Sequence, residues 1–169
     1  LESEFCCEDI HVECRLDRIT ALNLTSLEIA SIPDSIQKLT ELIILDLSRN
    51  NITGRISSAL LFLINLQVLN LGFNSLSGPI LSDIGSLLLN LRVLNLEHNL
   101  FSGQIPSTLK ELLLLEELYL SNNTGLIGAI PYIPQLEILD VDTGIIVEDG
   151  STADGSTEGQ QLNEINTTG

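Results

Sequence analysis

The sequence contains no Met and no Trp, and only seven of its 169 residues are Lys or Arg. Without Met it has no initiator residue, so we expect a processed or excised piece, and a removed signal peptide is one explanation. The length fits one domain, and with 44% apolar residues but no Trp the core must be filled mainly by Leu and Ile. No run of about 18 apolar residues occurs, so no segment is expected to span a membrane.

Acidic residues outnumber basic ones by 23 to seven, which gives a formal net charge of -16 at pH 7. This charge would repel a phosphate backbone, so the composition argues against nucleic acid and disfavours an anionic membrane surface. A basic protein, a cationic peptide or a neutral glycan stays compatible with it. No GxSxG elbow, HExxH helix, phosphate-binding glycine loop or dinucleotide fingerprint occurs, so we expect neither an enzyme nor a bound cofactor.

One pattern with a period of about 24 residues, LxxLxLxxNxLxGxIPxxLxxLxx, recurs five times and then begins again. The copies start at Ile19, Leu42, Leu66, Leu91, Leu115 and Leu136. Self-similarity of this kind indicates a solenoid, in which each repeat buries its apolar edge only against its neighbours. We therefore assign residues 19–144 to the repeats. Their lengths slip by one residue before Ile32, among Leu87 to Leu89 and near Gly125, and such slips belong in turns.

Each position of the repeat has a physical reason. Leu45 and Leu47 flank an outward Asp46, which indicates a short strand, and stacked copies of this strand predict a parallel sheet. The turn asparagines can satisfy buried backbone groups, so we interpret as structural Asn50, Asn74, Asn99 and Asn123. The glycines suit a turn with positive φ, and the prolines set an extended or turn conformation on the far side; they are Gly54, Gly78, Gly103, Gly128, Pro33, Pro106 and Pro131. We expect no regular helix on that side, and in the third copy the pattern assigns the last core position to Leu87.

The LxGxIP half of the repeat resembles the plant-type subclass of leucine-rich repeats. That family includes ectodomains of receptor-like kinases and receptor-like proteins, and the polygalacturonase inhibitors of cell walls. The resemblance covers roughly three quarters of the chain and rests on a recurring motif. It implies an α/β solenoid, a right-handed superhelix of about five to six repeats with a parallel concave β-sheet. It also implies a second, smaller strand near the LxGxI segment and short 3-10 turns on the convex side.

Three cysteines, Cys6, Cys7 and Cys14, precede the first repeat, where an open solenoid end needs a cap. They point to an oxidising compartment, and we assign residues 1–18 to an N-terminal cysteine cap, which the resemblance implies is truncated. The family's cap implies that Cys7 pairs with Cys14 and that Cys6 has lost an upstream partner. The alternatives are three free thiols in a cytosolic protein and a zinc site with His11, which lacks the usual paired spacing.

Four sequons agree with secretion, and we predict N-glycosylation at Asn23, Asn51, Asn122 and Asn166. Asn51 stands at a turn and is the most usable, whereas a glycan on Asn23 would cover the concave face. We therefore expect an extracellular protein, either secreted or a cell-surface ectodomain. Residues 145–169 lose the repeat, are rich in Gly, Ser and Thr, and carry five acidic residues with no Lys or Arg. We predict that they form an acidic disordered tail or a linker.

Function should lie at the outward positions of the strands, because the scaffold positions are already explained. Adjacent strands lie about 4.8 Å apart, so equivalent outward residues should form columns across the concave face. The middle strand position reads Asn23, Asp46, Asn70, Asn95, Tyr119 and Asp140, and the residue just before the turn asparagine reads Ser26, Arg49, Phe73, His98, Asn122 and Thr143. As candidate ligand-binding residues we select Asp46, Arg49, Asn70, Phe73, Arg92, Asn95, Glu97, His98, Tyr119 and Asp140.

Phe73 and Tyr119 are open aromatic side chains of the kind that anchor interfaces, or they only cover neighbouring strands. His98 beside Glu97 is a candidate pH-sensitive contact, although a lone surface histidine usually has no special role. Arg92 stands next to Glu116 and can simply neutralise it.

The last repeats form an acidic end, with Glu116, Glu137, Asp140 and Asp142. It could receive a basic partner or a calcium ion, and solvated surface charge is the simpler interpretation. Asp140-Val-Asp142 begins like a calcium loop, but Gly144 replaces the third oxygen ligand, so we predict no metal site. A glycosidase acid pair is disfavoured, because an open sheet offers no pocket to exclude water.

The leading hypothesis is an extracellular recognition module in signalling or defence that binds a protein, peptide or glycan on a rigid, preformed concave face. A co-receptor or a secreted enzyme would be a further partner. The second hypothesis is a secreted inhibitor of a cell-wall-degrading enzyme. The third is a structural or ice-binding repeat protein, which is disfavoured because the outward columns change residue type at nearly every step.

Overall fold

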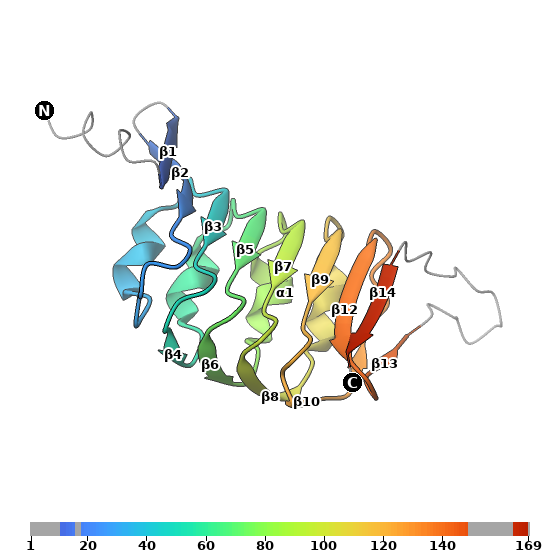
Figure 1. Ribbon diagram of the computed structural model, residues 1–169. Helices are drawn as coiled ribbons and strands as arrows, with labels where there is room; N and C mark the ends of the chain where they lie inside the picture. The colour runs from blue at the N-terminus through green and yellow to red at the C-terminus, as the bar shows by residue number, and fades with distance from the viewer. Residues whose placement is uncertain (1–10, 16–17, 149–163, 169) are drawn as a thin grey trace, which may run out of the picture.

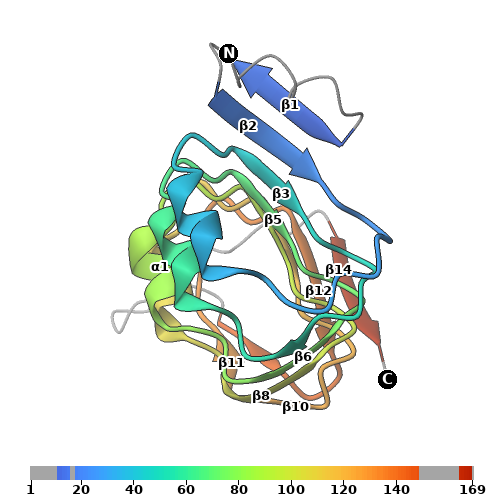
Figure 2. The ribbon, with the colours of Figure 1, turned by 90° about the vertical axis from the view of Figure 1, so that its left-hand side faces the viewer.

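The computed structural model of the chain describes residues 11–15, 18–148 and 164–168. The backbone winds through successive coils that stack side by side, and each coil adds one strand to a common sheet (Figure 1). In the view along the stack the main sheet, a second row of strands and the short helical turns occupy different sides of the coil (Figure 2). The predicted solenoid is confirmed.

The main sheet has eight strands in the order β1-β2-β3-β5-β7-β9-β12-β14. Their bounds are β1 Val12–Arg15, β2 Arg18–Asn23, β3 Ile44–Asp46, β5 Val68–Asn70, β7 Val93–Asn95, β9 Glu117–Tyr119, β12 Ile138–Asp142 and β14 Glu164–Thr168. The first pair, β1 with β2, is antiparallel, and the strands from β2 onward pair in parallel. The pairing puts the middle leucine of each repeat against its equivalent, and these leucines are fully buried from Leu45 to Leu139.

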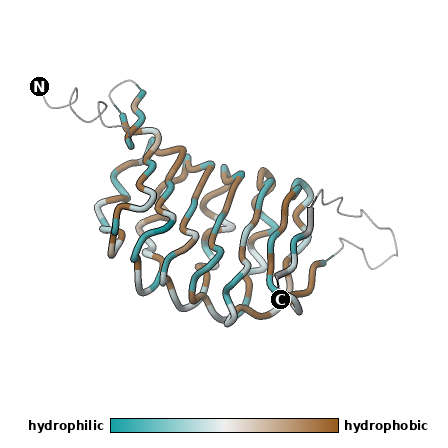
Figure 3. Tube along the Cα trace, viewed as in Figure 1, coloured by the Kyte–Doolittle hydropathy of each residue, from teal (hydrophilic) through white to brown (hydrophobic). Residues whose placement is uncertain are grey.

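The smaller strand implied by the resemblance is present at the LxG segment of each central repeat. A four-stranded parallel sheet in the order β10-β8-β6-β4 is formed by β4 Thr53–Gly54, β6 Ser75–Gly78, β8 Leu100–Gln104 and β10 Gly125–Ile127. Two further short strands pair with each other, β11 Ala129–Ile130 and β13 Ile146–Val147. The two sides of the coil enclose a core of leucine and isoleucine with Phe101 as its largest fully buried side chain. Hydrophobic and hydrophilic residues accordingly alternate around the coils (Figure 3).

The convex side, opposite the main sheet, carries one short helical turn in each of four coils. Three are 3-10 turns, η2 Asp34–Lys38, η3 Ser58–Phe62 and η4 Ser107–Glu111, whereas α1 Asp83–Leu87 is an α-helix. The expectation of no regular helix on this side is therefore wrong for the third repeat.

The extra residue among Leu87 to Leu89 explains this difference. In the second repeat Leu63 N–H donates to the carbonyl of Leu60, three residues back, but in the third Leu88 N–H donates to that of Ile84, four residues back. One added residue thus turns a 3-10 closure into an α closure. It also moves the core position, because Leu88 is fully buried while Leu87 is 47% exposed. The assignment of Leu87 to the core is wrong.

The turn asparagines are structural, as predicted. Asn99 accepts the Leu76 N–H at 2.9 Å and donates to the carbonyls of Leu71 at 2.9 Å, Leu96 at 3.2 Å and Glu97 at 3.1 Å. It therefore ties its own turn to the preceding coil through groups that would otherwise be buried without partners. The same arrangement recurs at Asn50, Asn74 and Asn123.

The region after the repeats differs from its prediction. Ile146–Val147 and Glu164–Thr168 are strands, and the second of these extends the main sheet by pairing with β12. The prediction of a disordered tail at residues 145–169 is therefore wrong for these two segments, and residues 149–163 lie outside the described residues. In β14 the residues Ile165 and Thr167 take the register positions of Leu139 and Val141. Among the described residues, the sheet thus contains two more strands than the six copies of the repeat indicated, β1 before them and β14 after them.

Candidate functional site

The solvent-facing side of the main sheet, here called the concave face, presents the predicted first column. Parallel register aligns the middle residues of successive strands from β2 to β12, namely Asn23, Asp46, Asn70, Asn95, Tyr119 and Asp140. Strand β14 adds Asn166 to the same column. The column is therefore a physical row of side chains, and its composition changes from amides to an aromatic and an acid along the stack.

The first half of this column is partly occupied by the scaffold itself. The side-chain oxygen of Asp46 accepts the Ser48 N–H at 2.9 Å, and Asn95 accepts the Glu97 N–H at 3.0 Å in the same way. Asn70 does so with Gly72 at 3.1 Å. Each side chain thus ends its own strand with a bond to the residue two positions on, a local role typical of Asn and Asp. This role was not predicted from the sequence, although Asn and Asp two residues before a turn are typical of it.

Three predicted residues are brought together in one continuous stack at the end of strands β3, β5 and β7. The Arg49 guanidinium carbon lies 4.3 Å from the centroid of the Phe73 ring. The His98 ring stacks on Phe73 with a centroid separation of 4.2 Å and an interplanar angle of 17°. The Asn122 amide nitrogen lies 3.2 Å from His98 Nε2 and continues the row into the next coil. We call Arg49, Phe73, His98 and Asn122 the stacked ladder.

All four residues of the stacked ladder have a left-handed backbone, with φ between 48° and 57°. This conformation costs an L-residue about 1–2 kcal/mol, and glycine would adopt it without that cost. Large side chains at strained positions are found at functional sites more often than elsewhere. The same left-handed backbone occurs at Ser26 of the first repeat, with φ 60°, so the conformation belongs to the repeat, and the stacked ladder is distinguished by the size and stacking of its side chains.

Tyr119 lies apart from the stacked ladder, in the first column on β9. Its hydroxyl donates to Glu117 Oε2 at 2.9 Å. The pKa of Tyr119 is raised to about 12, mainly by burial and also by the hydrogen bond to Glu117 and the negative charges of Glu117, Glu97 and Asp140. The side chain is therefore a neutral hydrogen-bonding aromatic at any physiological pH. The two predicted aromatic anchors, Phe73 and Tyr119, do not share a column.

The acidic end of the face is partly engaged by the protein. The two carboxylate oxygens of Asp142 accept the N–H groups of Asn122 at 2.7 Å and Asn123 at 3.0 Å. Asp140 accepts the Ser121 hydroxyl at 2.5 Å, and Glu116 pairs with Arg92, as the sequence indicated. Within the described part of the chain, no three His, Cys, Asp or Glu side chains are grouped so that they could hold a metal ion.

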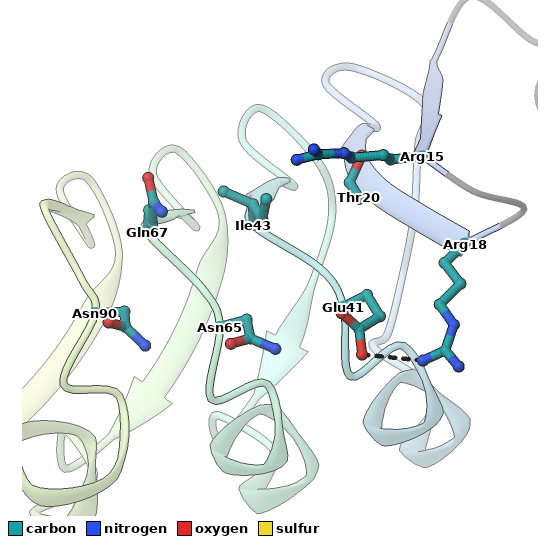
Figure 4. A pocket seen from close by; sticks show the side chains of 8 residues that line it. All are labelled: Arg15, Arg18, Thr20, Glu41, Ile43, Asn65, Gln67 and Asn90. Carbon is teal, nitrogen blue, oxygen red and sulfur yellow. Dashed lines mark hydrogen bonds and ion pairs between the residues drawn. The ribbon is translucent and has the colours of Figure 1, made fainter.

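A shallow cavity of about 610 Å³ opens at the other end of the sheet, where β1 and β2 meet the first repeats (Figure 4). Polar side chains dominate its lining, which consists of Arg15, Arg18, Thr20, Glu41, Ile43, Asn65, Gln67 and Asn90. Arg18 pairs with Glu41 at 3.0 Å, and Asn65 and Asn90 each donate to a carbonyl of the preceding coil. None of these residues was predicted from the sequence, because none lies at an outward position between the two leucines of a repeat.

The predicted covalent sites remain predictions. Cys14 is disulfide-bonded, but Cys6 and Cys7 lie outside the described residues, so the pairing with Cys7 is untested. Asn51 is exposed in a turn, whereas the Asn122 amide points to His98.

Known proteins share this architecture. The family model described as Leucine Rich Repeat matches residues 41–63, 65–87 and 90–112. The chain is 37% identical to the ectodomain of the membrane receptor kinase GASSHO1/SCHENGEN3 from Arabidopsis thaliana, solved in complex with CASPARIAN STRIP INTEGRITY FACTOR 2, with a TM-score of 0.75 over 86% of this chain and 18% of that one. It is 35% identical to the BIR2 ectodomain from Arabidopsis thaliana, with a TM-score of 0.70 over 74% of this chain and 67% of that one.

A plant ice-binding protein is 26% identical, with a TM-score of 0.67 over 87% of this chain and 57% of that one. No curated protein matches the chain.

The repeat, the parallel sheet and the ectodomain relatives agree on the class of protein, a leucine-rich repeat solenoid. The chain belongs to the plant extracellular leucine-rich repeat family. Within the described residues, no helix has the length and apolar character needed to cross a membrane.

Proposed function

We propose that the chain is the ligand-recognition part of a plant receptor-like protein and that its concave face binds a peptide or a protein. The observation that carries this proposal is the stacked ladder, in which bulky side chains are kept at left-handed positions on an open surface. Because stacking already fixes these side chains, a ligand would bind them with little further loss of side-chain freedom.

The related structures support the same function. The GASSHO1/SCHENGEN3 ectodomain was solved in complex with CASPARIAN STRIP INTEGRITY FACTOR 2, a second similar structure is the plant peptide hormone receptor RGFR1 in complex with RGF2, and a third is the BIR3–SERK2 complex. The net charge of -16 favours a basic or neutral partner, because it attracts cations over long distances. The chain spans only 18% of the length of the first of these relatives, so recognition by the whole receptor is part of the proposal.

Replacement of Phe73 by Ala tests the proposal. The partner would be selected from a displayed library of short peptides and from purified plant ectodomains, and its affinity measured for each variant. We expect Phe73→Ala to weaken binding by roughly tenfold or more, as for an anchor in an interface. Phe62→Ala is the matched control, because Phe62 is a 59% exposed phenylalanine on the convex side. Equal affinity of the Phe73 variant and the wild type would remove the stacked ladder from the site.

The extracellular location is part of this proposal and has its own test. Expression through a eukaryotic secretory pathway should give a glycan at Asn51, which is exposed, and no free thiol at Cys14. Intact mass before and after deglycosylation and alkylation would measure both. Complete alkylation of three thiols without prior reduction would contradict secretion.

Ice binding is a second candidate, favoured by the similarity to a plant ice-binding protein. Ice recognition requires a flat surface of matched residues, whereas the first column contains amide, carboxylate and phenol side chains. Measurable thermal hysteresis or inhibition of ice recrystallisation would favour this candidate over the first.

A further inference from the structure

We propose that an apolar patch on the outer edge of the solenoid is a dimer interface and that its partner is a second copy of the chain. Six of the eleven large hydrophobic side chains that are exposed among the described residues lie where the convex turns lead back to the main sheet. They are between 42% and 61% exposed, and we call them the apolar patch: Phe62, Ile64, Leu87, Leu89, Leu113 and Leu114. The inference does not depend on the proposed function.

The apolar patch is built on a tight turn that every repeat makes after its convex turn. A core carbonyl accepts the N–H three residues on, at 3.0 Å from Leu66 to Leu63 and at 3.0 Å from Leu91 to Leu88. The residue directly after the core position is exposed in all five repeats, as Thr40, Ile64, Leu89, Leu113 and Pro134. A threonine is accepted there in the first repeat, so the fold does not require the isoleucine and the leucines of the next three.

The turns that carry the apolar patch are fixed to one another. The Asn65 amide donates to the Thr40 carbonyl at 2.9 Å, and the Asn90 amide donates to the Ile64 carbonyl at 2.9 Å. Each amide thus ties its turn to that of the preceding repeat, and the two lie in one row (Figure 4). The apolar patch exposes roughly 500 Å², near the upper end for a single monomer. A partner would bind this rigid surface with little loss of conformational freedom.

The charge distribution selects a second copy as the partner. In the last two residues of each convex turn and the two-residue tips that follow, the charged side chains are Lys38, Glu41, Lys110 and Glu111. The border of the apolar patch is therefore neutral, although the chain has a net charge of -16. Two concave faces would repel each other, because each carries Asp46, Glu97, Glu117 and Asp140. The apolar patch lets two acidic copies meet without placing acid against acid, whereas an anionic lipid surface would be repelled.

A two-fold axis beside Leu89 uses the whole apolar patch. In such a contact each surface meets itself, so Leu89 would face Leu89 of the partner subunit. The second repeat of one copy then meets the fourth repeat of the other, which brings Ile64 against Leu113 of the partner subunit. With the polar border included, the contact falls near the lower limit for a specific interface. We therefore expect a reversible dimer with a dissociation constant of about 10–100 µM.

The stacked ladder stays open in this dimer. Its residues follow the strands of the main sheet, whereas the residues of the apolar patch precede them, so the two surfaces lie at opposite ends of the strands. Substitutions in the apolar patch should therefore leave the affinity of a single copy for a soluble ligand unchanged. Loss of the dimer and loss of ligand binding are separate results.

Sedimentation velocity of the 18.4 kDa chain tests the dimer. Over a concentration series from about 1 to 500 µM we expect the mass to rise toward that of two copies. Sodium chloride should lower the dissociation constant, because it screens the repulsion between two chains that each carry a charge of -16. A chain that stays monomeric at the highest concentration would overturn the inference. A dimer that weakens with salt would do so too, because ion pairs and not the apolar patch would then hold it.

Leu89→Glu and its matched control locate the contact. Leu89→Glu should raise the dissociation constant by about 100-fold or more, because two carboxylates would meet at the axis. Leu100→Glu makes the same change at a 63% exposed leucine on β8, outside the apolar patch, and should dimerise like the wild type. Circular dichroism should show the same fold for both variants, because both leucines are exposed. A dimer that persists in Leu89→Glu, or is lost equally in Leu100→Glu, would overturn the assignment.

A charge-swapped pair tests the symmetry. Leu89→Lys should be monomeric for the same reason as Leu89→Glu, because like charges would meet across the axis. An equimolar mixture of the two variants should dimerise again, since lysine on one copy then faces glutamate on the other. Only a contact in which position 89 faces itself predicts this recovery. A mixture that stays monomeric would overturn the two-fold arrangement at Leu89.

Discussion

Replacement of Asn99 by Ala should destabilise the solenoid by about 3 kcal/mol, and the structure shows where this free energy comes from. Loss of the side-chain oxygen leaves the Leu76 N–H without its acceptor inside the core. An orphaned buried donor costs about 1–3 kcal/mol. The three carbonyls that lose the Asn99 amide each keep one other donor. The Leu71 carbonyl still accepts from Asn74, the Leu96 carbonyl from Asn123, and the Glu97 carbonyl from the Phe73 N–H. They therefore add only about 0.5 kcal/mol apiece.

Asn74 provides the matched comparison. It accepts one N–H, that of Ile52, and donates to three carbonyls, so it makes the same number of hydrogen bonds as Asn99. Asn99 is only 5% exposed, whereas Asn74 is half-buried and water can replace part of its bonds. We therefore expect Asn74→Ala to cost about 1 kcal/mol less than Asn99→Ala.

Urea unfolding at neutral pH, followed by circular dichroism with the slope of the transition compared between variants, would measure both changes. Asn99→Asp should be at least as damaging as Asn99→Ala, because it keeps the acceptor but buries a negative charge against three carbonyl oxygens. A change in the free energy of unfolding below about 1 kcal/mol for Asn99→Ala, or equal changes at Asn99 and Asn74, would refute the reasoning that the turn asparagines stabilise the solenoid in proportion to their burial.

Further predictions concern packing, ionisation and the end of the sheet. Gly85→Ala should lower the free energy of unfolding in denaturant by about 3 kcal/mol or more, because a Cβ would lie 2.1 Å from the Thr108 carbonyl oxygen. In the control variant Gly103→Ala the new Cβ meets no atom within 4 Å, so we expect a loss of only about 1 kcal/mol, caused by the positive φ at this position. Ultraviolet titration should show Tyr119 ionising near pH 12, above the usual value of 10. Because the pKa is raised in the folded protein, the contribution of neutral Tyr119 to stability is complete below pH 10 and is lost as the pH rises through 12. A titration near pH 10 would contradict the buried environment. Deletion of residues 149–169 should leave one edge of β12 unpaired and speed hydrogen exchange of its amides, and unchanged exchange would contradict the pairing with β14.

The repeat predicted the scaffold well because each coil is specified locally. Alternation around Leu45 sets the strand, and the same alternation 24 residues later sets its neighbour at Leu69, so the pairing follows without any long-range information. The structural role of the turn asparagines was also predictable, because it depends only on their position in the turn. The convex turn of the third repeat was not predictable, because any of the three consecutive leucines Leu87, Leu88 and Leu89 could fill the core position. Only the closure from Leu88 to Ile84 decides which one is buried.

The candidate site was predicted residue by residue but not as a unit. Arg49, Phe73 and His98 were each selected as outward residues, yet their stacking depends on a left-handed backbone that periodicity does not reveal. Strand β14 escaped detection for a different reason. Its Thr167 stands where an apolar residue normally ends the strand pattern, so the repeat signal is too weak to separate from a polar linker.

The helix α1 has a wider consequence for how such a chain can change. The additional residue is accommodated entirely in the convex turn, which closes as an α turn instead of a 3-10 turn. The strands on either side of it, β5 and β7, still pair in regular parallel register from Val68 with Val93 onward. Length changes in the outer turns therefore leave the order of residues that face a ligand untouched. The inner surface can keep a specificity while the outer surface drifts, and a new specificity can arise one coil at a time without rebuilding the rest.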